Sequence, residues 1–191
     1  PSSCYLLSFN LFPLGSQDIS AYPKGAYTGE ISGEVLRSLN VSYSLIHHSE
    51  RVKYQKESLA ITKEKIIRAL ENDIVPIICV GDSKEEKEKK ETLTTLYSSL
   101  DYLFKDIKKD SCIIAYEPLY SIGTGVLPTK DELTIVIKAL KDKYQLPVLY
   151  GGSVNDKNII ELKNIPNLDG FLLGGISLDL KSLKKLIEEI E

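Results

Sequence analysis

The chain has 191 residues, of which 42% are hydrophobic and 27% are charged, and its formal net charge is −3. This length suffices for one domain with a substantial core, so we expect a single globular domain over residues 1–191. Such a weak negative net charge gives no indication of binding to nucleic acid or to an anionic membrane surface. No apolar stretch of the sequence is long enough for a membrane-spanning helix. We therefore expect neither nucleic acid nor membrane as a partner.

The chain contains three cysteines, Cys4, Cys79 and Cys112, which are far apart in the sequence. Their spacing fits neither a zinc site nor a disulfide framework. Cys79 and Cys112 lie in apolar runs. We therefore expect buried thiols in a reducing compartment, which indicates a cytoplasmic protein.

Short apolar runs alternate with amphipathic runs along the chain. The apolar runs predict strands, and the amphipathic runs predict helices because their apolar residues recur three and four positions apart. In chain order, the predicted strands are 14–19, 41–46, 74–80, 112–116, 146–150 and 170–173. The predicted helices are 6–12, 58–73, 83–107, 131–144 (with Thr129 as a candidate cap), 156–164 and 179–190.

The alternation of strands and helices indicates an α/β fold. Short apolar strands of this kind form a parallel sheet that is covered on both faces. Two architectures fit this pattern, a doubly wound open sheet and a β/α barrel. In both, ligands bind at the carboxyl ends of the strands, so functional residues are expected at those ends.

One strand end carries the most informative segment of the chain. The apolar run 112–116 is followed by Glu117 and Pro118, and the proline ends the strand because it has no backbone N–H to donate. A Gly-Thr-Gly turn follows at 123–125, where backbone N–H groups can point at a ligand. This layout predicts a general base beside an anion-binding loop. The alternative is a glutamate on a surface loop.

Glycines also follow the last two predicted strands, at 151–152 and 174–175, and Ser153 completes the first of these clusters. Together with the turn at 123–125 they suit a phosphate group, because backbone N–H groups can approach its oxygens where no Cβ intervenes. Each glycine could instead serve the packing of a helix on a strand. No nucleotide-binding fingerprint or Walker lysine is present, so we expect a small phosphorylated substrate rather than a nucleotide.

The two histidines of the chain, His47 and His48, follow the strand predicted at 41–46. Neighbours on a strand point to opposite faces, so at most one of them is expected to face a shared site. No compact set of further ligands accompanies them, and a metal role is not expected. Glu50 and Arg51 are predicted to form either an ion pair that orients the site or a surface pair of little consequence. A neutral histidine and a carboxylate base together indicate proton abstraction next to a carbonyl.

Several blocks of the sequence occur together in a known order and spacing. They are 26–32 (AYTGEIS), 48–51 (HSER), 115–118 (AYEP), 122–125 (IGTG), 150–154 (YGGSV) and 169–175 (DGFLLGG). With these blocks the chain resembles the triosephosphate isomerase family from about residue 17 to its carboxyl end. The resemblance implies a (β/α)₈ TIM barrel that interconverts dihydroxyacetone phosphate and D-glyceraldehyde 3-phosphate through an enediolate, without a cofactor or a metal.

The resemblance also implies the roles of the site residues. Glu117 would move the proton between the two substrate carbons, and His48 would polarise the carbonyl oxygens and stabilise the enediolate. Ser49 and Glu50 would support the site around His48. The segment 118–128 would form a lid that excludes water. The residues implied to bind the phosphate through backbone N–H groups are Gly123, Ser153, Gly174 and Gly175.

The family further implies a homodimer that works in cytoplasmic glycolysis and gluconeogenesis. The segment from Asp18 to Gly29 resembles the loop that reaches into the partner subunit. Three features depart from the family pattern. Tyr120 stands where the lid hinge usually has tryptophan and keeps an aromatic anchor, Asp82 stands where glutamate is usual, and Pro128 is expected to stiffen the other hinge.

No segment matches the family's first strand, which carries an asparagine and a lysine that enter the active site. The predicted strands match the third to the eighth of the family, and a complete barrel has ~250 residues. We therefore expect an α/β TIM barrel that lacks about its first two βα units, in an incomplete sequence. The strands at 14–19 and 170–173 would then be unpaired edges, and the isomerase activity of residues 1–191 alone would be very low.

Two other functions fit parts of the pattern. Another phosphate-handling barrel, such as a lyase or an isomerase of sugar or amino-acid biosynthesis, would share the glycine turns. It would not combine the block 48–51 with Glu117, Pro118 and the Gly-Thr-Gly lid. The second is a non-catalytic remnant that persists as a binding module. The presence of His48 and Glu117 argues against such a remnant, whereas the missing lysine argues for it.

Overall fold

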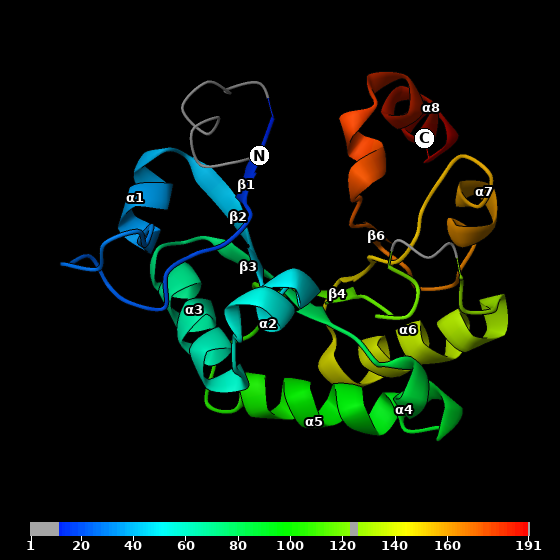
Figure 1. Ribbon diagram of the computed structural model, residues 1–191, viewed down its shortest axis with the longest axis horizontal. Coiled ribbons are helices and arrows are strands. Elements are labelled where there is room, and N and C mark those ends of the chain that lie inside the picture. Colours follow the sequence, from blue (N-terminus) through cyan, green and yellow to red (C-terminus); the bar gives the residue numbers. More distant parts are fainter. Residues whose placement is uncertain (1–11, 123–125, 191) are drawn as a thin grey trace. The chain divides into compact units, whose positions relative to one another are not determined.

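The computed structural model describes residues 12–122 and 126–190. The chain divides into two compact units, the first from residues 1–79 and 98–113 and the second from 80–97 and 114–191 (Figure 1). The helix predicted at 6–12 lies almost wholly outside the described residues, as do Cys4 and the Gly-Thr-Gly turn at 123–125.

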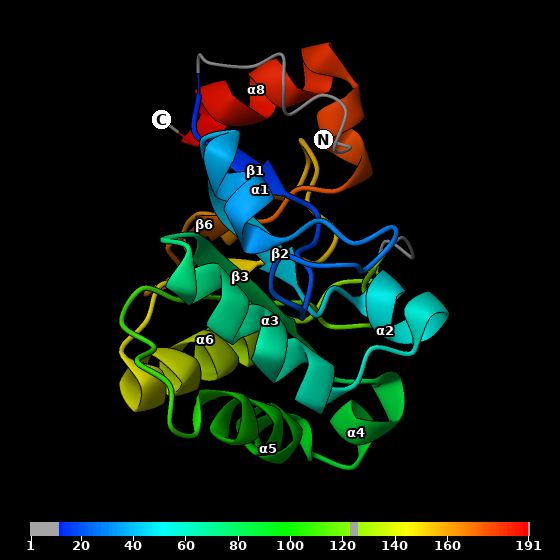
Figure 2. The same ribbon diagram turned by 90° about the vertical axis from the view of Figure 1, so that its left-hand side faces the viewer.

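Parallel strands form the centre of the first unit. Its strands are β1 (Leu14–Ser16), β2 (Val41–Ile46) and β3 (Val75–Val80), with β2 paired to β1 on one side and to β3 on the other. Figure 2 shows α1 (Gly33–Ser38) and α3 (Leu59–Glu71) beside β2, and both helices contact it. The apolar ends of β2 are fully buried there, which explains why this strand matches its predicted bounds.

One helix of the first unit, α3, was predicted and begins at a capping serine, whereas α1 and α2 were not predicted. Ser58 caps α3 by accepting a hydrogen bond from the N–H of Ile61 at 3.4 Å. The short α1 was not predicted, because six residues show no helical periodicity. The helix α2 (Ser49–Gln55) was also missed, since its sequence buries no residue and so has no apolar face.

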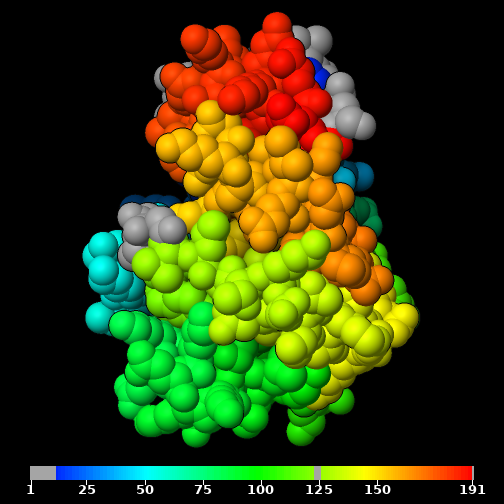
Figure 3. Space-filling view, turned by 90° about the vertical axis from the view of Figure 1, so that its right-hand side faces the viewer, coloured from blue at the N-terminus to red at the C-terminus, as the bar shows by residue number. Residues whose placement is uncertain are grey.

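The second unit repeats the strand–helix order. Its strands β4 (Ile113–Tyr116), β5 (Val148–Tyr150) and β6 (Gly170–Phe171) are parallel, and Tyr116 pairs with Tyr150, which pairs with Phe171. Its helix α4 (Lys84–Glu88) precedes these strands, and α6 (Lys130–Tyr144), α7 (Ile159–Leu162), the short 3₁₀ segment η2 (Gly175–Leu178) and α8 (Leu180–Ile190) alternate with or follow them. The helix α5 (Thr92–Phe104) belongs to the second unit up to residue 97 and to the first unit from residue 98. Figure 3 shows the surface over α6, α7 and α8.

Two helix predictions for this part of the chain have clear outcomes. Thr129 caps α6, as predicted, in a reciprocal pair of hydrogen bonds with Glu132. The single helix predicted at 83–107 is wrong, because the chain breaks between α4 and α5, where Lys90 has a φ of 61°. Within the described part of the chain, no helix has the length and apolar character needed to cross a membrane.

Candidate active site

His48 occupies the turn between β2 and α2 and caps that helix. β2 ends at Ile46, so the two histidines are turn residues, and the alternation expected for strand neighbours does not apply to them. His47 has a φ of 64°, which turns the backbone sharply before His48. The Nδ1 atom of His48 accepts a hydrogen bond from the backbone N–H of Glu50 at 3.3 Å. His48 therefore sits at a position fixed by the first turn of α2.

This hydrogen bond assigns the ring hydrogen of His48. Because Nδ1 accepts from a backbone N–H, the neutral ring carries its hydrogen on Nε2. The Glu50 carboxylate lies 3.9 Å from the same Nδ1, but a neutral ring forms no ion pair with it, and the Glu50 side chain is 76% exposed. Ser49 and Glu50 form the first turn of α2 beside the ring. His48 can therefore present an Nε2–H donor, the group needed to polarise a carbonyl.

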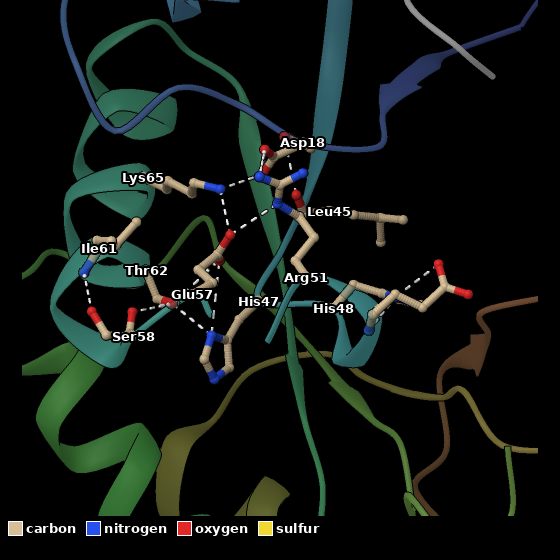
Figure 4. A network of polar contacts seen from close by, with 12 residues as sticks. Asp18, Leu45, His47, His48, Arg51, Glu57, Ser58, Ile61, Thr62 and Lys65 are labelled. Carbon is tan, nitrogen blue, oxygen red and sulfur yellow. Dashed lines mark hydrogen bonds and ion pairs between the residues drawn. The ribbon is translucent and has the colours of Figure 1, made fainter. Parts of the chain in front are cut away.

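Arg51, also in the first turn of α2, belongs to a network of charged side chains (Figure 4). Its guanidinium lies 2.9 Å from carboxylate oxygens of both Asp18 and Glu57. Lys65 of α3 lies 2.7 Å from Asp18 and 2.5 Å from Glu57. The side chains of Glu57 and Lys65 are 2% and 4% exposed. Arg51 therefore pairs with Asp18 and Glu57, and the predicted pair with Glu50 is wrong.

The network keeps Glu57 ionised. Burial by itself raises the pKa of the Glu57 carboxyl, but hydrogen bonds from His47, Lys65 and Arg51 outweigh it and lower this pKa to about 2. For Asp18 the balance is reversed, since burial raises its pKa despite Lys65 and Arg51. The charges tie α3 and the segment after β1 to the helix that His48 caps.

His47 belongs to this structural network. Its Nδ1 atom lies 2.6 Å from the hydroxyl oxygen of Thr62 and 3.8 Å from the Glu57 carboxylate (Figure 4). The buried Thr62 hydroxyl donates its hydrogen to the carbonyl of Ser58 at 2.9 Å, so His47 is the donor to Thr62. The ring of His47 is therefore committed to α3.

Glu117 directly follows β4, where the structure buries it to 3% exposure. Its backbone N–H donates to the carbonyl of Val80 at 2.8 Å, and the N–H of Leu119 donates to the carbonyl of Asp82 at 3.0 Å. Pro118 between them has no N–H and ends the strand, as predicted. The strand therefore delivers a carboxylate at a fixed position with little water around it, which suits a general base.

Two glycines leave the room that Glu117 occupies. A Cβ at Gly81 would lie 1.8 Å from the carbonyl oxygen of Glu117, and a Cβ at Gly151 would lie 2.8 Å from its Cγ. Neither site can accept a larger residue without displacing the glutamate. Both glycines therefore serve close packing against Glu117.

Asp82 holds the strand end that carries Glu117. This fully buried carboxylate accepts hydrogen bonds from the hydroxyls of Tyr116 at 2.9 Å and Thr92 at 2.6 Å. Burial, followed by the charge of Asp82, raises the pKa of Tyr116 and keeps its hydroxyl protonated as a donor. The family usually has glutamate at this position. The shorter side chain of Asp82 still reaches Tyr116, the last residue of β4.

Ser153 connects the loop after β5 to the segment after Glu117. Its hydroxyl donates to the carbonyl of Ser121 at 2.9 Å, and its own carbonyl accepts from the side-chain amide of Asn158 at 2.9 Å. The fully buried Ser121 also places its hydroxyl 3.4 Å from that of Tyr150. The candidate base and a candidate phosphate-binding loop are therefore joined within one unit.

The predicted phosphate-binding glycines after β6 lie at the start of η2. A Cβ at Gly174 or at Gly175 would meet no atom within 4 Å, so the backbone there is open to a ligand. Gly123 lies outside the described residues. Phosphate binding by Ser153, Gly174 and Gly175 stays a prediction that this open backbone supports.

The candidate residues fall into two groups, each assembled within its own unit. The first unit holds His48, Ser49 and Glu50, and the second holds Glu117, Ser153, Gly174 and Gly175.

The residues that support His48 were missed by the sequence analysis. The buried face of α3 contains Thr62, Lys65, Ile66 and Ala69. Lys65 therefore occupies a core position of an amphipathic helix, and a lysine at such a position signals a buried anionic partner. That partner is Glu57, which lies just before the helix and belongs to no sequence motif or periodic pattern. Asp18 is distant in sequence, so no local signal connects it to this site.

The described residues offer no metal site, since no three of their histidine, cysteine, aspartate or glutamate side chains gather as ligands. Cys79 and Cys112 are buried free thiols, as predicted. Burial raises the pKa of the Cys112 thiol to about 12, so this cysteine is unreactive at neutral pH.

Comparison with known proteins decides the family. The family model described as triosephosphate isomerase matches residues 4–190. The chain belongs to the triosephosphate isomerase family. It is 43% identical to a triosephosphate isomerase of Mycoplasmopsis agalactiae, over 98% of this chain and 76% of that protein. It is 42% identical to one of Thermus thermophilus, over 91% of this chain and 74% of that protein. It is 41% identical to a triosephosphate isomerase of Mesomycoplasma hyorhinis, over 91% of this chain and 72% of that protein.

Membership of this family confirms the predicted fold class and isomerase class. The six strands of the described residues are parallel and alternate with helices, as in part of a TIM barrel. The family supports triose phosphate isomerisation, a step of glycolysis, as the function. The chain spans about three quarters of the length of the three relatives.

Proposed function

We propose that Glu117 and His48 together catalyse the interconversion of dihydroxyacetone phosphate and D-glyceraldehyde 3-phosphate. The observation that carries this proposal is the hydrogen bond from the Glu50 N–H to Nδ1 of His48, because it leaves an Nε2–H donor on a neutral ring. Glu117 supplies the second requirement, a buried carboxylate at a strand end.

The reaction balances with these two groups alone. The Glu117 carboxylate removes a proton from the carbon next to the carbonyl, and the electron pair of the C–H bond moves to form the enediolate. His48 donates a hydrogen bond from Nε2 to the oxygen on which negative charge develops. Nε2 of His48 then gives its hydrogen to this oxygen and takes the hydrogen of the hydroxyl on the neighbouring carbon, so the ring ends neutral and the second oxygen can become the new carbonyl. The protonated Glu117 returns its proton to the carbon that held the original carbonyl, which completes the exchange of aldehyde and ketone.

The loops after β5 and β6 bind the substrate's phosphate in this proposal. Ser153, Gly174 and Gly175 offer backbone N–H groups, and Gly123 adds another from the lid that spans 118–128. The open space beside the backbone at Gly174 and Gly175 supports this role. Phosphate binding on one side of the reacting carbons fixes their orientation, which supplies much of the rate.

We also infer a homodimer formed through the segment from Asp18 to Gly29, in the cytoplasm. Arg51 and Lys65 anchor the start of this segment at Asp18. Further along, Tyr22 and Tyr27 stack with ring centroids 4.4 Å apart while remaining 49% and 42% exposed. An exposed aromatic pair of this kind suits a protein–protein contact. Buried free thiols agree with a reducing compartment.

Replacing His48 by asparagine tests the electrophile. Asparagine caps helices well, so it keeps the start of α2, but it is too short to replace the imidazole. We expect kcat for glyceraldehyde 3-phosphate to fall by about 10²–10³-fold with the melting temperature unchanged, because one donor to the enediolate is lost. Steady-state turnover and thermal unfolding measure both quantities. A variant with the parent's kcat would exclude His48 from the reaction.

A further inference from the structure

Lys87, in the last turn of α4, contacts both ends of the segment that separates Glu117 from α6. Its ammonium group lies 4.8 Å from the ring centroid of Tyr120, three residues after Glu117. The same group lies 2.9 Å from a carboxylate oxygen of Glu132, in the first turn of α6. The ammonium group of Lys87 therefore contacts one residue near the start of this segment and one residue just after its end.

The carboxylate that Lys87 contacts is itself held in place. The carboxylate oxygen of Glu132 that Lys87 contacts also accepts the backbone N–H of Thr129 at 2.8 Å, in the cap of α6. On the other side, the half-buried ring of Tyr120 offers its face to the ammonium, which is a favourable cation–π contact. Lys87 thus connects the start of α6 to the chain just beyond the candidate base.

The electrostatics favour a charged Lys87. Burial lowers the pKa of this lysine, but Glu132 and Tyr120 outweigh that effect, so the net shift is upward. The pKa of Tyr120 is raised by burial and then by Asp82, while Lys87 opposes the shift. The ammonium and the neutral phenol ring therefore coexist over the physiological pH range.

We propose that Lys87 is a positioning residue for Glu117. By fixing Tyr120 and the first turn of α6, it restricts the path of the chain that leaves the base and so restricts the base itself. The inference rests on the proposed function, in which Glu117 abstracts the proton. A partly exposed ion pair contributes little to global stability, so the effect of Lys87 is expected in local order and in kcat.

The test compares Lys87→Met with Lys87→Arg and with Lys89→Met. Methionine keeps the length of the stem and removes the charge, whereas arginine keeps the charge and the cation–π contact. Lys89 is the matched control, since it pairs with Glu85 at 2.7 Å on the exposed side of the same region. Amide hydrogen exchange of the peptide 117–122 reports local order without requiring turnover.

We expect Lys87→Met to accelerate exchange in the peptide 117–122 and to lower kcat by about 10–100-fold, with KM changed less than about twofold, since small misplacements of a reacting group are costly. Lys87→Arg and Lys89→Met should match the parent chain in both measurements. Unchanged exchange in Lys87→Met would overturn the inference, and so would a Lys87→Arg variant that behaves like Lys87→Met.

A parallel Glu117→Gln variant separates this inference from the proposed function. If Glu117→Gln abolishes turnover while Lys87→Met changes neither exchange nor kcat, only the positioning role fails. If Glu117→Gln keeps full turnover while Lys87→Met still accelerates exchange, the assignment of the base fails and Lys87 retains only a role in local order.

Discussion

Replacing Glu117 by glutamine is expected to lower kcat for glyceraldehyde 3-phosphate by about 10²–10⁴-fold, the usual contribution of a positioned general base. Glutamine has nearly the same shape, so it fits the space that Gly81 and Gly151 leave, but it cannot accept a proton from carbon. KM should change little, because the proposed phosphate contacts come from the loops after β5 and β6. Steady-state kinetics of the purified variant measure both constants.

Glu85→Gln is the control for this variant, because Glu85 is an exposed partner of Lys89 with no place in the site. It should leave kcat unchanged. Incorporation of deuterium from heavy water into the substrate carbon gives a second readout, which Glu117→Gln should suppress together with turnover. A Glu117→Gln variant that still exchanges the carbon-bound hydrogen at the parent's rate would show that another group is the base.

Replacing Lys65 by methionine is expected to lower the free energy of unfolding by about 3–5 kcal/mol, because it leaves a buried carboxylate without one of its cations. Lys65 contacts Asp18 and Glu57, and the side chain of Glu57 is 2% exposed. Denaturant unfolding measures the loss. Lys89→Met, at an exposed pair, should lie within about 0.5 kcal/mol of the parent.

Measuring the free energy of unfolding at decreasing pH tests whether the charge network around Glu57 causes this loss. The pKa of Glu57 in the folded chain is about 2, below its ordinary value of 4.5, so this group stabilises the fold above pH 4.5 and the stabilisation is lost as pH falls towards 2. The raised pKa of Asp18 acts in the opposite direction. In Lys65→Met the Glu57 contribution should disappear at a higher pH. Coinciding acid limbs for variant and parent would contradict the assigned network.

The elements that the sequence predicted best are those whose signal is local. The strand β2 matches its predicted bounds because its two apolar ends are buried in the core, and α6 begins where Thr129 offers a cap. Glu117 at the end of β4 was predictable because the following proline must end the ladder. The blocks of sequence around these residues also identified the family.

The supports of the site depend on contacts that are distant in sequence. Lys65 meets Asp18, which lies 47 positions before it, and Lys87 meets Glu132, which lies 45 positions after it. No period or spacing connects such pairs. The direction of the His47 ring was equally unpredictable, since it depends on a left-handed backbone at that residue and on the hydroxyl of Thr62.

In the proposed reaction, an imidazole and a carboxylate act on the same three-carbon substrate. A crystal structure of the chain with a phosphorylated, planar enediolate analogue bound would show whether both groups reach it. We expect Nε2 of His48 and a carboxylate oxygen of Glu117 both to lie within about 3.5 Å of the analogue, with its phosphate at Gly174 and Gly175. An analogue bound with either side chain out of reach would rule out joint catalysis by these two residues.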